Sequence, residues 1–93
     1  PLLDNSGTYN NFGVYLIKQN EYAQAVEWLD KAIARNANVP LYYRNRAVAN
    51  YRLGNILDAV HDAKKAMDLG DERAKEMLKT LRGLIQAGQN ADN

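Results

Sequence analysis

The stretch that decides the fold is PLYYRNRAVANYRLGNILDAVHDAKKAMDL, residues 40–69. It contains two amphipathic helical patterns, separated by a short break at residues 53–55. When the stretch is moved back by 34 residues, its residues 43–69 lie on residues 9–35, and many positions carry the same amino acid. The matching pairs are Tyr9 and Tyr43, Asn11 and Asn45, Val14 and Val48, Ala25 and Ala59, and Ala32 and Ala66. A fixed period of this length indicates a repeat array in which one helix pair is the unit.

The length of the chain fits one small domain, and its composition excludes several kinds of site. The chain has 93 residues and a net charge of +1, so no bulk attraction to nucleic acid or to a membrane is expected. It has no cysteine, which excludes disulfides and thiolate chemistry, and no apolar run is long enough for a transmembrane helix. The compartment stays open, with a cytoplasmic location expected if the segment represents its parent. Because the chain begins at Pro1, we expect it to have been excised from a longer protein.

Residues that favour helix ends divide the sequence into five predicted helices. A flexible leader (residues 1–5) precedes them, and a flexible tail (residues 89–93) follows. Ser6, Asn20 and Asn55 are predicted helix N-caps, because their short polar side chains can accept an orphan backbone N–H. Pro40 suits a first helical turn, and Gly54 suits a left-handed C-cap. The breaks are only two or three residues long, so consecutive helices must run antiparallel.

The positions of large and small residues within each unit resemble those of a known repeat family. The first unit offers Tyr9, Phe12, Gly13, Leu16, Tyr22, Ala25, Leu29 and Ala32, and the second offers Tyr43, Ala47, Gly54, Ala59 and Ala66. In this pattern the chain resembles the tetratricopeptide repeat (TPR) family, whose unit is a 34-residue helix–turn–helix. The resemblance implies an all-α fold, an α-α superhelix of TPR hairpins. Repeat one would span residues 6–39 and repeat two residues 40–73, and a capping helix at residues 74–88 would close a domain of residues 6–88.

The chain departs from the family pattern at two positions. Arg46 stands where a bulky apolar residue is usual, and Asn50 replaces a usual aromatic residue or leucine. We expect Arg46 to bury its stem and to leave its guanidinium in water.

No constellation of residues predicts catalysis, so we expect neither an enzyme, nor a cofactor, nor a metal site. His61 and Asp62 are adjacent on a helical pattern, where side chains one apart do not face each other. The glycines stand alone at predicted helix ends rather than in a phosphate-binding loop. Helical spacing makes packing between helices, rather than base stacking, the expected use of Tyr9, Tyr22 and Tyr43.

The inner side of the first helix of each pair is the candidate site. A stack of hairpins curves, and its concave side is lined by these helices. The predicted partner-binding residues are Asn10, Asn11, Val14, Leu41, Arg44, Asn45, Val48, Tyr51, Arg52, Lys75, Lys79 and Arg82. An apolar floor beside a basic wall suits a protein segment, peptide or helix, with an acidic group and an apolar anchor. Two alternatives stay open here: the basic stripe on residues 75–82 could only solvate a face, and Asn11 and Asn45 could bond between hairpins.

Three other functions stay open with less support. The segment could be a structural part of a longer array, or it could self-associate through an exposed hairpin face. Some TPR domains grip a C-terminal carboxylate, and the resemblance implies partial equivalents in Asn45, Lys75 and Lys79, whereas Asn10 and Val14 supply no lysine from the first helix. RNA binding through Tyr51 and the basic stripe is disfavoured by the near-neutral charge.

Overall fold

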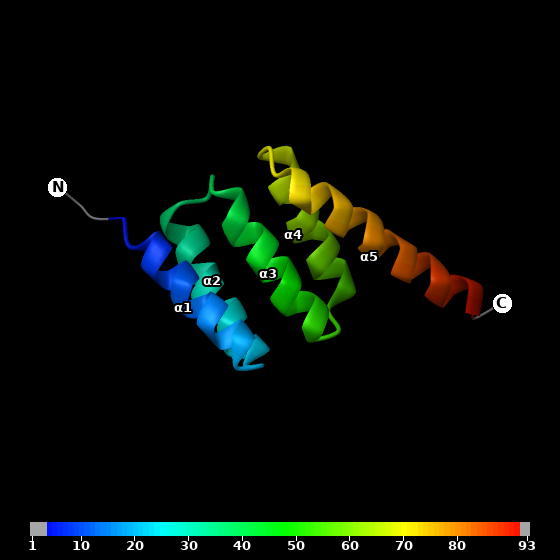
Figure 1. Cartoon of the computed structure of the whole chain (residues 1–93), viewed down its shortest axis with the longest axis horizontal. Helices are drawn as coiled ribbons and strands as arrows, with labels where there is room; N and C mark the ends of the chain where they lie inside the picture. The colour runs from blue at the N-terminus through cyan, green and yellow to red at the C-terminus, as the bar shows by residue number, and fades with distance from the viewer. Residues whose placement is uncertain (1–3, 92–93) are drawn as a thin grey trace.

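The computed structural model describes residues 4–91, which form five α-helices and no strand (Figure 1). The helices are α1 (Ser6–Lys18), α2 (Tyr22–Arg35), α3 (Pro40–Arg52), α4 (Ile56–Asp68) and α5 (Glu72–Ala91). Residues 1–3 of the predicted leader and residues 92–93 of the predicted tail lie outside the described part. No helix in that part is both long enough and apolar enough to cross a membrane.

The helices form two antiparallel hairpins and a closing helix, as the sequence predicts. α1 pairs with α2, α3 pairs with α4, α3 packs on α2, and α5 packs on α4. In Figure 1, α1, α3 and α5 lie on the side toward the viewer, and α2 and α4 lie behind. The predicted all-α stack of helical hairpins is therefore confirmed.

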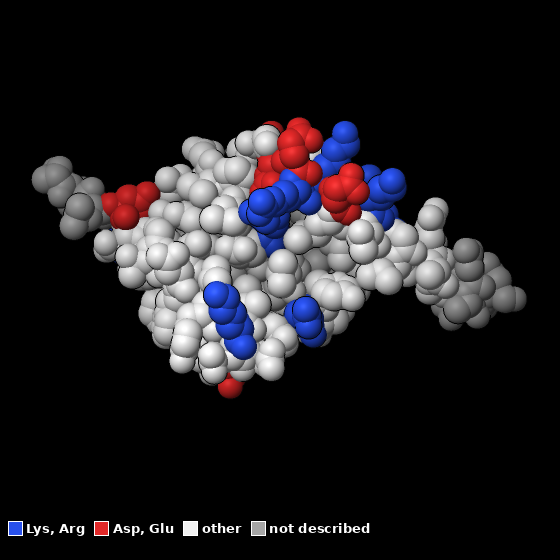
Figure 2. Space-filling view, in the orientation of Figure 1, with Lys and Arg blue, Asp and Glu red and all other residues white. Residues whose placement is uncertain are grey.

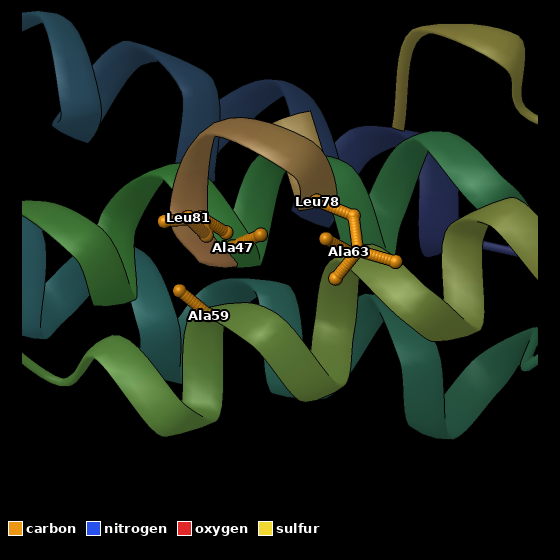
Figure 3. Packing of buried hydrophobic residues seen from close by; sticks show 5 residues of the cluster. All are labelled: Ala47, Ala59, Ala63, Leu78 and Leu81. Atoms are coloured by element: carbon orange, nitrogen blue, oxygen red, sulfur yellow. The ribbon is translucent and has the colours of Figure 1, made fainter. Parts of the chain in front are cut away.

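Small side chains let the helices approach closely. The cluster that joins α5 to hairpin two consists of Ala47, Ala59, Ala63, Leu78 and Leu81 (Figure 3). The three alanines have no exposed surface, and the two leucines of α5 fill the space that the alanines leave. In hairpin one the close approach needs a glycine, because a Cβ on Gly13 would lie 2.8 Å from Cγ of Leu29. This alternation of small and large residues fixes the distances between the helices.

The predicted helix ends are partly right. Gly54 has a φ of +84°, which confirms the left-handed C-cap, and Pro40 is the first residue of α3, as predicted. The prediction for Ser6 is wrong. Ser6 lies inside α1, and its Oγ is 2.9 Å from Oη of Tyr42, in a hydrogen bond that ties the two hairpins together. The first turn of α1 is held by Asp4, whose carboxylate accepts the backbone N–H of Ser6 at 2.8 Å.

The prediction for Asn20 is also wrong. Its φ is +62°, so it ends α1 in the left-handed conformation that asparagine tolerates better than most residues. Its Oδ1 accepts the hydroxyl of Tyr22 rather than a backbone N–H of α2. Asn55 does occupy the N-cap position of α4, but its side chain makes no capping bond.

α5 differs from the predicted capping helix at both ends. It begins at Glu72 instead of residue 74, after Asp71 has accepted the backbone N–H groups of Arg73 and Ala74. It continues through Gly88 to Ala91, past the predicted end at residue 88. A glycine in a helix costs only about 1 kcal/mol, and Gly88 has no positive φ, so nothing in its backbone stops the helix.

Candidate partner-binding site

A mainly apolar hollow of about 360 Å³ opens between α3 and α5. Three of its side chains were predicted from α3, and three come from α5: Val48, Tyr51, Arg52, Met77, Thr80 and Leu81. We call this space the α3–α5 hollow. It can accept an apolar side chain from a partner, and it lies on α3 residues that the hairpin core leaves free.

Tyr51 and Arg52 give the hollow its recognition chemistry. Tyr51 is 42% exposed, so its aromatic ring and its hydroxyl are accessible to a partner. Arg52 is exposed, and within residues 4–91 it makes no ion pair. An apolar anchor beside a free guanidinium suits a segment that combines an apolar side chain with an acid.

The basic stripe of α5 lies elsewhere. Lys75, Lys79 and Arg82 line a second hollow, of about 700 Å³, together with Met67 of α4. The structure therefore does not bring them together with Val48 and Tyr51 of the α3–α5 hollow. Figure 2 shows that charges on the face of α1, α3 and α5 concentrate near the α4–α5 turn, where both signs mix.

Two of the three asparagines among the predicted site residues make a hydrogen bond between the hairpins. Nδ2 of Asn45 donates to Oδ1 of Asn10 at 2.9 Å, and Asn10 is only 5% exposed. The partner is thus Asn10, not the period-matched Asn11, which is exposed. Of the two uses that the sequence left open, this contact favours bonding between hairpins, and one N–H of the Asn45 amide is already used.

The remaining predicted residues are spread along the same face. Nε of Arg44 donates to Oδ2 of Asp71 at 2.8 Å, so this guanidinium holds the start of α5. Val14 is half-buried, and Leu41 is 39% exposed. Val14 and Val48 both keep exposed surface, so neither is sealed inside a closed bundle.

A polar network fills the space between α2, α3 and α4 on the other side of the molecule. Arg46 donates to both oxygens of Asp62, at 2.9 and 2.7 Å, and to Oδ1 of Asp30 at 2.8 Å. Asn50 donates to Asp62 at 3.1 Å. The prediction that the head of Arg46 stays in water is therefore wrong, because its side chain is 22% exposed and its guanidinium is paired on two sides.

The electrostatics of this network follow from its geometry. Burial by itself lowers the pKa of Arg46, but the hydrogen bonds and charges of Asp62 and Asp30 outweigh burial and raise it above its ordinary value. No buried side-chain nitrogen or oxygen lacks a hydrogen-bond partner in the described residues. The buried donors and acceptors of the network are thus all used within the protein.

His61 is exposed beside the network, and residues 4–91 contain no group of His, Asp and Glu side chains placed to hold a metal ion. The arrangement can recognise a partner by shape, apolar contact and single charges.

Sequence reasoning missed the contribution of α5 to the hollow. The predicted site took Lys75, Lys79 and Arg82 from this helix and did not include Met77, Thr80 or Leu81. The available signal was the width of the apolar arc on this helix. Met77, Leu81 and Leu84 recur at steps of four and three beside the core leucine Leu78, and Leu84 stays 44% exposed. An arc wider than one neighbouring helix covers indicates a second contact surface.

The comparisons with known proteins agree with this architecture. A sequence model described as "Tetratricopeptide repeat" matches residues 6–39, which comprise hairpin one and its connection. The chain is 35% identical over 79 residues to "Protein SGT1 homolog" of Bos taurus, an alignment that covers 85% of this chain and 23% of that protein. It is 33% identical over 69 residues to "Small glutamine-rich tetratricopeptide repeat-containing protein 2" of Mycosarcoma maydis, an alignment that covers 74% of this chain and 20% of that protein. It is 31% identical over 74 residues to "Hsp70-Hsp90 organizing protein" of Triticum aestivum, an alignment that covers 80% of this chain and 12% of that protein.

The stacked helical hairpins define a helical-repeat protein. The chain belongs to the tetratricopeptide repeat family. It spans less than a quarter of the length of these relatives.

Proposed function

We propose that the chain is a non-enzymatic scaffold that binds a segment of another protein across the face of α1, α3 and α5. The α3–α5 hollow carries this proposal, because it is an open, mainly apolar space beside an exposed tyrosine and a free arginine. The segment would place an apolar side chain against Val48 and Tyr51 and an acid near Arg52. The name of the wheat relative, "Hsp70-Hsp90 organizing protein", supports a role in joining proteins.

The carboxylate grip has less support. One N–H of the Asn45 amide is used by Asn10, and Lys75 and Lys79 line a different hollow. Lysine also lacks the planar fork with which arginine holds a carboxylate twice.

The experiment is a selection of short peptides from a random display library against the whole chain. The selected peptides are then titrated by calorimetry and by residue-level NMR shifts. We expect the shifts to cluster on α3 and α5 around the hollow, and Tyr51→Ala to weaken binding by about tenfold or more, since buried tyrosines dominate such contacts. Leu57→Ala is the control, because Leu57 is a large apolar residue that is 76% exposed and lies outside the hollow. Shifts confined to α2 and α4, or equal losses in both variants, would contradict the proposal.

A further inference from the structure

A second surface, remote from the α3–α5 hollow, carries an exposed aromatic cluster. Phe12 meets Trp28 edge to face at a centroid distance of 4.6 Å, and its ring lies nearly parallel to that of Tyr15, at 6.1 Å. Phe12 is 41% exposed and Tyr15 is 54% exposed. We call Phe12, Tyr15 and Trp28, together with the two cations described below, the aromatic face.

The 34-residue period shows what this surface corresponds to in hairpin two. Phe12, Tyr15 and Trp28 match Arg46, Ala49 and Asp62. In hairpin two these positions face hairpin one. Ala49 has no exposed surface and packs with Leu16 and Ala25, and Arg46 pairs with Asp30 of α2. The three aromatic residues of this face therefore match a surface that hairpin two buries, and in hairpin one this surface stays open.

The surface that covers those positions in hairpin two has a recognisable composition. α2 presents Val26 and Ile33, both partly buried against α3-containing clusters, and Asp30 between them along the helix. Asp30 lies 2.8 Å from the guanidinium of Arg46. A helix with an apolar stripe and an adjacent acid thus fits this position of the repeat.

The positive charges of the aromatic face also favour a helix with an apolar stripe and adjacent acidic residues. Nζ of Lys31 lies 4.1 Å from the centre of the Trp28 ring, and the guanidinium of Arg35 lies 5.8 Å from the centre of the Tyr9 ring. Neither cation makes an ion pair in the part of the chain that the structure describes. Hydrogen bonds from Ser6 and Asn36, together with the charge of Arg35, lower the pKa of Asp4, so one carboxylate already lies near Arg35.

We propose that the aromatic face binds an amphipathic helix of another protein, whose apolar stripe is flanked by acidic residues. The stripe covers Phe12 and Tyr15, and the acids pair with Lys31 and Arg35. A second copy of this chain fits less well, because a twofold contact through the aromatic face sets Lys31 and Arg35 against the same cations. This site is separate from the proposed groove, so either can fail without the other.

Trp28 gives a direct test, because it is the only tryptophan of the chain. The probe is a tryptophan-free peptide about five helical turns long, with leucines at alternating steps of three and four and glutamates beside them. One control peptide has lysine for every glutamate, and another has the same composition in an order without a stripe. Titration into the whole chain is followed by Trp28 fluorescence and by residue-level NMR shifts.

The acidic striped peptide is expected to change the Trp28 fluorescence and to bind at least about tenfold more tightly than either control. Tyr15→Ser should weaken this binding by about tenfold, whereas Tyr51→Ala should leave it unchanged. The pair Lys31→Gln and Arg35→Gln should weaken it and flatten its salt dependence. Far-ultraviolet circular dichroism checks that each variant keeps its helices.

Three results would overturn the proposal. The first is no binding of the acidic peptide, or equal binding of the lysine or stripe-free peptide. The second is binding that depends on Tyr51 rather than Tyr15, which would place the peptide in the α3–α5 hollow. The third is a concentration-dependent mass in sedimentation that Tyr15→Ser abolishes, which would make a second copy the occupant.

Discussion

Replacing Asp62 with alanine should lower the free energy of unfolding by about 2–3 kcal/mol. The carboxylate accepts two hydrogen bonds from Arg46 and one from Asn50, and its side chain is only 4% exposed. Removing one partner of a buried ion pair costs about 3–5 kcal/mol, because a charge is left unpaired. The loss expected here lies at or just below the bottom of that range, since Arg46 keeps some exposure and its contact with Asp30.

The measurement is urea unfolding followed by circular dichroism at neutral pH. Asp30→Ala is the matched control: it also removes a carboxylate from Arg46, but its side chain is 54% exposed. It should cost less than about 1 kcal/mol, as exposed ion pairs do. The combined replacement Arg46→Met with Asp62→Leu should cost less than Asp62→Ala alone, because it removes both charges and fills the space.

The reasoning fails if Asp62→Ala and Asp30→Ala differ by less than about 0.5 kcal/mol, the usual range of a surface substitution. It also fails if the combined replacement is the most destabilised of the three variants. Either result would mean that the buried carboxylate does not balance the charge of Arg46.

Three further predictions follow from single contacts. Gly13→Ala should lower the free energy of unfolding by about 1–3 kcal/mol through overpacking. Gly83→Ala should raise it by up to about 1 kcal/mol, because nothing lies within 4 Å of the added Cβ and alanine favours a helix. Thermal unfolding of the two variants measures this difference. Asn45→Ala should cost about 1–3 kcal/mol in urea, since it leaves the buried Asn10 carbonyl without its donor; a negligible loss would mean that water replaces the donor. The pKa of Asp4 is lowered from 3.8, chiefly by hydrogen bonds from Ser6, so its contribution to stability is present above the unfolded value and disappears as pH falls through the folded value. An NMR titration should place its midpoint below 3.8, and a midpoint at or above 3.8 would contradict the assignment.

The helices and their order could be predicted because they depend on local signals. Alanines and bulky residues recur at the same positions of each unit, and Pro40 and Gly54 act through their own backbone preferences. The caps were less predictable, because the same side chain has several possible partners. Ser6 bonds to Tyr42, which is distant in sequence, and Asn20 uses its tolerance of a positive φ instead of its amide.

The groove was harder to predict because it depends on the rotation of α5 about its own axis. The sequence shows an apolar stripe and a basic stripe on this helix, but not which stripe lies next to α3. Leu78 and Leu81 pack on the alanines of α4 and α3, and this contact sets the rotation. Met77 and Thr80 are thereby directed toward the α3–α5 hollow, and Lys79 lines the hollow beside α4.

The matched positions of the two hairpins show why their order matters. Where hairpin two has the ion pair of Arg46 and Asp62, hairpin one has the aromatic pair of Phe12 and Trp28. The ion pair is stable at an interior position because α2 supplies Asp30 as a second anion for the guanidinium. An aromatic pair needs no such neighbour and can stay partly exposed. If the hairpins exchanged places, Arg46 would lose Asp30 and the open surface would carry a partly satisfied charge, so the polar network favours this order over the reverse.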